Sequence, residues 1–224
     1  MNSLNNLKSE LKQNSNIEKA EIYRKFFKTG KGEYGEGDIF LGLSVPQTRS
    51  IAKKYKDISI LEISKLLDSK IHEERLAALE ILNMKYESKN IPEKQKEEIF
   101  NFYLSHTKWV NNWDLVDLSA EYIVGDFLFE KDKSILYKLA KSDNVWERRI
   151  AIISTFNFIK KEKFDDTLKI AEIFIKDNHD LIQKAVGWML REVGKRDKKV
   201  EEQFLKKNYK IMARTTLRYA IEKF

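Results

Sequence analysis

Two tryptophans and two aspartates stand close together in the segment from His106 to Asp117. Trp113 and Asp117 are four positions apart, so on a helix the indole and the carboxylate would share one face. Asp114 follows two asparagines that can cap a helix, and the helix dipole favours a negative charge in the first turn. Asp114 is therefore predicted to be structural. For Asp117, residue types alone leave two interpretations open: a salt bridge beside a core tryptophan, or half of a catalytic pair.

The elements that must hold these side chains are predicted to be helices. The chain has only two prolines and eight glycines, and five of the glycines fall between positions 30 and 42. Elsewhere apolar residues recur every three or four positions, as at Leu76, Leu79 and Leu82, which indicates an all-α fold. The glycine-rich loop over residues 30–45 lacks the Lys-Ser/Thr ending of a phosphate-binding loop. We expect a mobile connection there, with a DNA-contacting flap as the alternative.

A weak internal repeat organises these helices. A basic residue followed by small and apolar residues recurs at Arg75, Arg149, Lys184 and Arg218, at intervals of about 35 residues or twice that. This period predicts stacked antiparallel helix pairs, a HEAT-like α-solenoid that forms a single domain over residues 1–224. If the four basic residues point into its concave face, they form a basic stripe that can follow a phosphate backbone. The alternative is a solvated charge at the edge of each helix.

Composition narrows the classes of function. Forty-two Lys and Arg residues against thirty-five Asp and Glu give a net charge of +7, which suits a polyanionic partner. The absence of cysteine excludes disulfides, thiolate metal sites and cysteine nucleophiles, and the three scattered histidines argue against a zinc site. No apolar run reaches the roughly 18–20 residues of a membrane span. Because the first residues lack an apolar signal core, we expect a cytoplasmic protein.

Three segments together resemble the AlkD-type DNA alkylation repair glycosylases. They read Trp113-Asp-Leu-Val-Asp117, then Trp146-Glu-Arg-Arg149-Ile-Ala-Ile, then Lys184-Ala-Val-Gly-Trp188-Met-Leu-Arg-Glu. Residues 26–49 and 214–224 resemble one branch of the same family, so the likeness covers nearly the whole chain. It implies a HEAT-like α-solenoid with a concave basic face that excises N3- and N7-alkylated purines from duplex DNA, the first step of base excision repair.

The resemblance also implies roles for individual residues. Trp113, Asp117 and Trp188 correspond to the residues of the family's active cleft. The cleft arginine corresponds to Arg149, with Arg148 as an added basic neighbour. The full set of expected DNA-binding residues is Arg75, Arg148, Arg149, Lys184 and Arg218.

The implied chemistry needs neither a metal nor a cofactor. Alkylation at N7 of guanine or N3 of adenine makes the base cationic, which weakens its glycosidic bond. Asp117 would stabilise the positive charge that develops on the deoxyribose and hold the attacking water. The indoles would contact the cationic nucleotide. We expect a monomer with duplex DNA carrying alkylated purines as its partner, in a bacterial-type cytoplasm and nucleoid-associated when bound.

Two other functions remain open at this point. A non-catalytic binder of DNA structure would keep the basic stripe and would not need Asp117. A HEAT-like scaffold for protein interactions would instead have an apolar or acidic groove. The sequence also leaves open whether the damaged base is flipped out of the duplex, and whether Tyr23 or Tyr34 contacts DNA.

Overall fold

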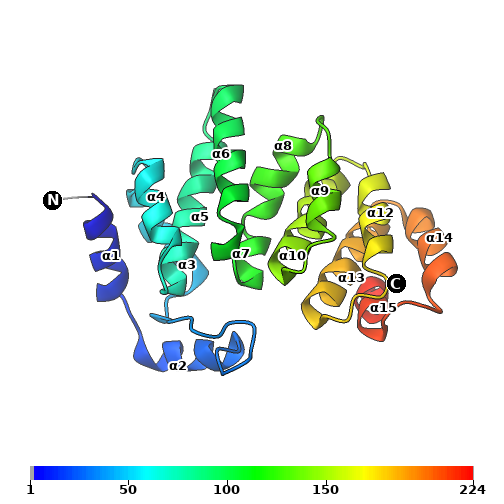
Figure 1. Ribbon diagram of the computed structural model, residues 1–224, viewed down its shortest axis with the longest axis horizontal. Helices are drawn as coiled ribbons and strands as arrows, with labels where there is room; N and C mark the ends of the chain where they lie inside the picture. Colours follow the sequence, from blue (N-terminus) through cyan, green and yellow to red (C-terminus); the bar gives the residue numbers. More distant parts are fainter. Residues whose placement is uncertain (1–2, 224) are drawn as a thin grey trace. The chain divides into compact units, whose positions relative to one another are not determined.

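The computed structural model describes residues 3–223, and their regular structure is helical apart from one isolated bridge between Ile39 and Ile71. The predicted all-α fold of stacked helices is thereby confirmed (Figure 1). The chain divides into two compact units, which meet in sequence between Ser119 and Ala120. The single repeat domain over residues 1–224 and its concave basic face stay predictions.

Unit 1 is built around one buried helix. That helix, α5, packs against α3, α4, α6 and α7. In Figure 1, α2 runs crosswise to α1 and α3. The elements of unit 1 are α1 (Ser3–Gln13), α2 (Ile17–Phe26), α3 (Val45–Lys54), α4 (Ile60–Leu67), α5 (His72–Tyr86), α6 (Glu93–Ser105), the 3-10 turn η1 (Thr107–Trp109) and α7 (Trp113–Asp117).

The α5 helix is unusual because it buries charge as well as apolar surface. Besides Leu76, Leu79 and Leu82, it buries several ionisable side chains. Buried charges need partners, because leaving one unpaired in the interior costs several kcal/mol. These side chains are therefore expected to form a polar network. They are His72, Glu73, Glu74, Arg75 and Glu80.

Unit 2 is organised around α13, which packs against α10, α14 and α15. Gly187 makes the closest of these approaches possible. A Cβ at this position would lie 2.5 Å from both the Thr216 carbonyl oxygen and the Tyr219 Cβ of α15. The elements are the π-helix η2 (Glu121–Gly125), α8 (Asp126–Leu128), α9 (Ser134–Leu139), α10 (Val145–Ser154), α11 (Phe156–Lys160), α12 (Asp165–Ile173), α13 (Asp180–Gly194), α14 (Lys198–Asn208), α15 (Arg214–Ala220) and η3 (Ile221–Lys223).

The internal repeat exists, but its register differs from the one predicted. In α5, α10 and α13, the fourth residue after the N-cap donates to the carbonyl six positions earlier, just before the helix begins. These donors are Arg75, Arg148 and Gln183, and their acceptors are Ser69, Ser142 and Asp177 at 2.8, 2.9 and 2.9 Å. Arg75 is therefore equivalent to Arg148, whereas Arg149 and Lys184 lie one position further along their helices.

Within residues 3–223, no helix is long and apolar enough to cross a membrane. No group of three or more His, Asp or Glu side chains in this range is arranged to hold a metal ion.

Candidate active site

The helix that carries Trp113 and Asp117 is only five residues long, so its position depends on anchors at its start. Asn112 is fully buried, and its side-chain oxygen accepts a hydrogen bond from the Trp113 backbone N–H at 2.9 Å. Asp114, the residue after Trp113, accepts a hydrogen bond on its side chain from the Leu115 backbone N–H at 2.8 Å. The asparagine cap and the structural role of Asp114 agree with the sequence prediction.

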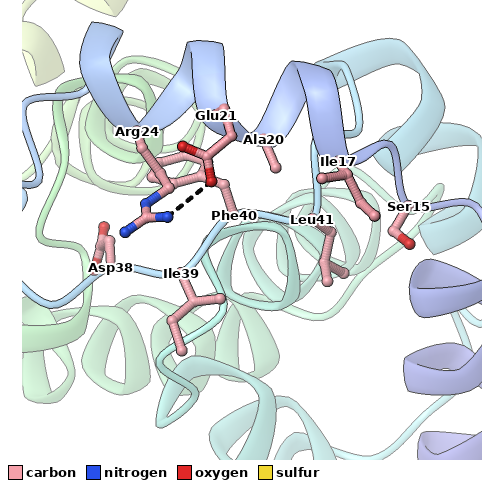
Figure 2. A pocket seen from close by; sticks show the side chains of 9 residues that line it. All are labelled: Ser15, Ile17, Ala20, Glu21, Arg24, Asp38, Ile39, Phe40 and Leu41. Carbon is pink, nitrogen blue, oxygen red and sulfur yellow. Dashed lines mark hydrogen bonds and ion pairs between the residues drawn. The ribbon is translucent and has the colours of Figure 1, made fainter.

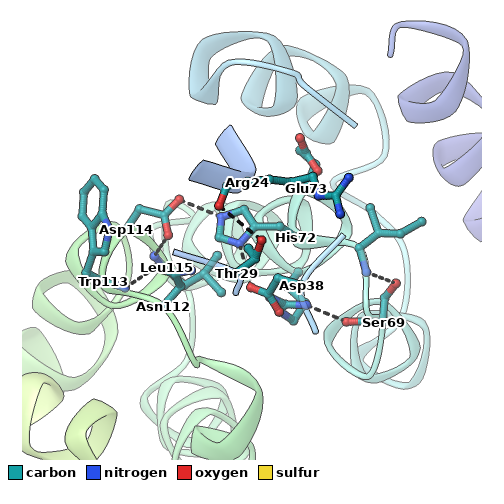
Figure 3. Close-up of polar contacts among 12 residues, drawn as sticks. Arg24, Thr29, Asp38, Ser69, His72, Glu73, Asn112, Trp113, Asp114 and Leu115 are labelled. Carbon is teal, nitrogen blue, oxygen red and sulfur yellow. Dashed lines mark hydrogen bonds and ion pairs between the residues drawn. The ribbon is translucent and has the colours of Figure 1, made fainter. Parts of the chain in front are cut away.

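Asp114 also belongs to a buried ionic network that the sequence did not reveal. Its Oδ2 accepts a hydrogen bond from Nε2 of His72 at 2.8 Å, and Nδ1 of His72 faces Asp38 at 3.5 Å. Arg75 completes the network by donating to the same Asp38 oxygen at 2.6 Å. Figure 3 shows His72 between the two carboxylates. This network ties the start of α7 to α5 and to the loop that follows α2.

The two carboxylates keep His72 protonated. Burial alone would lower the pKa of this imidazole, but the charge and hydrogen bond of Asp114, helped by Asp38, raise it to about 9. Arg75 opposes this increase. At neutral pH the network therefore contains two cations and two anions, and its charges balance within the interior.

Aromatic rings make a second connection between α7 and the rest of unit 1. Trp113 stacks on Phe27 with ring centroids 5.3 Å apart, Phe27 stacks on Phe40 at 5.0 Å, and Phe40 stacks on His72 at 4.6 Å. The four rings thus run in sequence from the protonated imidazole to the indole. Phe26 meets the Trp113 ring edge-on at 5.9 Å and is 61% exposed. One face of the Trp113 indole is therefore covered by Phe27.

The glycine-rich loop is anchored through its second half. Glu73 accepts hydrogen bonds from three consecutive backbone N–H groups, those of Leu41, Gly42 and Leu43, at 2.9, 2.8 and 3.2 Å. Gly42 has φ +84°, and a Cβ there would come within 2.2 Å of the Asn16 carbonyl oxygen, so only glycine fits. These bonds hold Phe40 in the ring stack.

Unit 1 contains two hollows beside this network. One, of about 150 Å³, has walls formed by Tyr23, Phe26, Phe27 and Phe40 and includes His72 in its lining. The other, of about 390 Å³, is lined by residues that include Arg24, Asp38 and Phe40 (Figure 2). Asp117 lines neither hollow.

Asp117 ends α7 one turn after Trp113, and it is partly exposed. The predicted helical spacing of these two residues is confirmed. Its charge also acts on Tyr103: burial raises the pKa of this phenol, and Asp117 adds to the increase. Asp117 therefore lies near the boundary between the buried Tyr103 and solvent, where a carboxylate can remain accessible to a substrate.

The remaining predicted active-site residue, Trp188, lies in α13 of unit 2. It is half-buried, and its ring lies 5.6 Å from that of Phe156. Whether its indole faces Asp117 stays a prediction.

The expected DNA-binding residues differ in their surroundings. Arg75 was wrongly assigned to an exposed basic stripe, because it is 1% exposed and its guanidinium is bonded to Asp38 and Ser69. Arg149 is also buried, and it donates to the Leu181 carbonyl at 2.6 Å. Of the others, Arg148 pairs with Asp177 at 2.9 Å, Lys184 pairs with Asp180 at 2.6 Å, and Arg218 is exposed beside the Tyr219 ring.

The pKa of His72 predicts how stability depends on pH. Because the pKa is about 9 in the folded protein and about 6.5 when the chain is unfolded, protonated His72 stabilises the fold fully below pH 6.5, and this contribution is lost as pH rises through 9. We expect the free energy of unfolding to fall by roughly 2–3 kcal/mol between pH 7 and pH 9.5. Urea titrations at both pH values measure this change.

A His72→Gln variant is the control for this experiment, and it should show a much smaller change over the same range. Glu201 interferes little, because burial raises its pKa to about 7, so about half of it is already ionised at pH 7, and the control variant shares the rest of its titration. Equal pH dependence of the variant and the wild type would contradict the assignment.

Solved structures confirm the all-helical fold. A predicted DNA alkylation repair enzyme from Enterococcus faecalis superimposes with a TM-score of 0.72 at 16% identity, covering 94% of this chain and 96% of that one. AlkD2 from Streptococcus mutans superimposes with a TM-score of 0.59 at 17% identity, covering 92% and 98%. This protein therefore has the all-helical repeat fold of these structures. Among curated proteins no sequence matches the chain significantly.

The family itself is identified by sequence. Residues 7–224 match the family described as DNA alkylation repair enzyme. This chain belongs to that family, which agrees with the resemblance found in the three tryptophan-containing segments.

Proposed function

We propose that this protein is a monofunctional DNA glycosylase that hydrolyses the N-glycosidic bond of N3- or N7-alkylated purines in duplex DNA. Family membership supports a role in DNA repair. The observation that carries the finer proposal is the setting of Asp117: a partly exposed carboxylate one turn after Trp113, on a short helix fixed by buried ion pairs and stacked rings. A carboxylate held in this way is preorganised to stabilise a developing cation.

The proposed reaction balances without an added acid. The bond between N9 and C1′ breaks with both electrons leaving on the base, which neutralises the positive charge that alkylation created. The deoxyribose becomes cationic, and Asp117 stabilises it through its negative charge. A water oxygen then bonds to C1′ and releases its proton. The products are a free alkylpurine and an abasic site.

The proposed substrate contacts involve both tryptophans and a set of basic residues. The Trp113 indole has one face on Phe27, so its remaining surface is what a nucleotide would meet. Trp188 is the second proposed aromatic contact. Phosphates would be bound without sequence readout by Arg148, Arg149, Lys184 and Arg218. Of these, Arg218 is exposed, whereas binding through Arg149 requires its guanidinium to exchange the Leu181 carbonyl for a phosphate.

Release of 7-methylguanine and 3-methyladenine from methylated duplex DNA is the direct test. We expect the wild-type protein to release at least one of these bases and to leave abasic sites in equal number. Binding of duplex DNA without release of either base would instead identify a non-catalytic binder on the same fold. Comparing the two bases also establishes the preferred lesion.

We also propose that the protein acts as a monomer in the cytoplasm, associated with the nucleoid when bound to DNA. The excess of basic residues supports attraction to DNA. Sedimentation of the free protein at micromolar concentration tests the monomer, and a dimer would contradict it.

A further inference from the structure

Two cationic side chains, those of Lys160 and Arg196, lie close to the Phe156 ring in unit 2. Phe156 and Lys160 are four positions apart on α11, and the Lys160 ammonium lies 4.7 Å from the centre of the Phe156 ring. The Arg196 guanidinium lies 5.9 Å from the same ring. Tyr122 adds a second ring 5.7 Å from Lys160. Aromatic faces attract cations, so the Phe156 ring favours the presence of two positive charges near one another.

Carboxylates lie beneath these cations. Lys160 is paired with Glu121, whose side chain is 6% exposed, whereas that of Lys160 is 43% exposed. Glu192 is 9% exposed and binds both Lys195, at 2.6 Å, and Arg196, at 3.2 Å. Burial alone would raise the pKa of Glu192, but the two cations lower it. The Arg196 side chain, at 25% exposed, is also more accessible than that of Glu192, although its guanidinium donates to the Glu192 carbonyl at 2.9 Å as well. Because the cations are more exposed than their carboxylates, a ligand approaching this surface meets positive charge first.

Phe156 also connects the two cations to Trp188. The Phe156 and Trp188 rings are 5.6 Å apart and inclined at 59°. Lys160 and Arg196 therefore both contact a ring that itself packs against Trp188, the tryptophan that the proposed glycosylase reaction uses.

We propose that Lys160 and Arg196, arranged around Phe156, form a phosphate clamp that binds the DNA backbone beside the alkylated nucleotide. The position beside that nucleotide rests on the proposed function, because it follows from the role of Trp188. Arg196 offers the planar fork that matches phosphate oxygens, and Lys160 adds a mobile point charge. Neither cation needs to read a base, so the clamp binds without sequence preference.

Binding of an unmodified, fluorescently labelled DNA duplex at several salt concentrations tests the clamp. We expect Arg196→Gln to weaken binding on the order of 10-fold at low salt. The slope of log affinity against log salt should also fall by about one for each phosphate contact that is lost. The matched control is Lys169→Gln, which removes one exposed positive charge from α12 of the same unit and should change affinity little.

The corresponding Lys160 variant needs a second change, because removing the lysine alone would leave the buried Glu121 carboxylate without its cation. Lys160→Gln combined with Glu121→Gln avoids this and should weaken binding to a similar extent. Phe156→Leu keeps apolar volume and removes the ring, so it should weaken binding less than loss of either cation. Thermal melting verifies that each variant folds.

The outcomes separate the clamp from the proposed reaction. If the Arg196 and Lys160 variants bind with the affinity and salt slope of the wild type, or no more weakly than Lys169→Gln, the clamp is wrong. The clamp is also wrong if the wild type binds no duplex, or if it binds an acidic peptide as tightly as DNA. Normal clamp behaviour in a protein that releases no alkylated base would instead contradict only the glycosylase.

Discussion

Asp117→Asn is expected to slow release of 7-methylguanine on the order of 10²–10³-fold, because it removes the negative charge that we propose stabilises the developing deoxyribose cation. Asparagine has nearly the same shape, and Asp117 is only partly buried, so the variant should fold and bind duplex DNA almost normally. Single-turnover release from methylated DNA measures the chemical step, and thermal melting measures folding.

Two further variants make this experiment specific. Asp57→Asn removes an exposed carboxylate elsewhere in unit 1 and should leave the rate unchanged. Trp188→Ala should cause a smaller loss than Asp117→Asn, because it removes contact area and no charge. Trp113→Ala is less informative, since its indole also stacks on Phe27 and its loss would destabilise unit 1. A stable Asp117→Asn protein that excises at the wild-type rate would falsify the proposed mechanism.

Local patterns in the sequence predicted the all-α fold and the short helix that carries Trp113 and Asp117. Helical periodicity and the scarcity of breakers gave the all-α fold, and the asparagine cap with its four-residue spacing placed Trp113 and Asp117 on one short helix. Both features depend on residues close together in the chain. Local hydrogen bonding and side-chain periodicity determine them, so a single sequence is sufficient.

The network beneath that helix could not be predicted in the same way. His72 joins Asp38 and Asp114, which are 34 and 42 positions away in sequence, and no local pattern links them. A single histidine at the start of a helix, as His72 is, occurs in many proteins and does not by itself indicate a buried ion pair. One signal was available in the sequence: α5 carries many charged residues among its apolar ones. Its apolar residues alone give no reason for burying those charges.

The repeat shows a related difficulty. Aligning basic residues by type placed Arg75 with Arg149, whereas hydrogen bonding places it with Arg148. The error is one residue, but on a helix one residue is about 100° of rotation, so it changes which neighbours a side chain meets. Repeat alignment by residue type therefore found the period and missed the register.

Asp114→Asn is expected to lower the free energy of unfolding by about 3–5 kcal/mol at pH 7, because it breaks a buried ion pair and removes the carboxylate that keeps His72 charged. The loss should exceed that of Asp126→Asn, whose partner Lys161 lies 3.4 Å away near the surface, where an ion pair contributes about 0–1 kcal/mol. Urea unfolding of both variants measures the difference.

A double-mutant cycle then attributes the loss to the ion pair and extends it to function. Combining Asp114→Asn with His72→Gln removes both charges, so the double variant should be more stable than the sum of the two single losses indicates. Because Asp114 fixes the start of the helix that carries Trp113 and Asp117, the single variant should also excise more slowly per folded molecule. A single variant within about 0.5 kcal/mol of the wild type would mean that His72 does not depend on Asp114 for its charge, and that the stacked rings alone are sufficient to position α7.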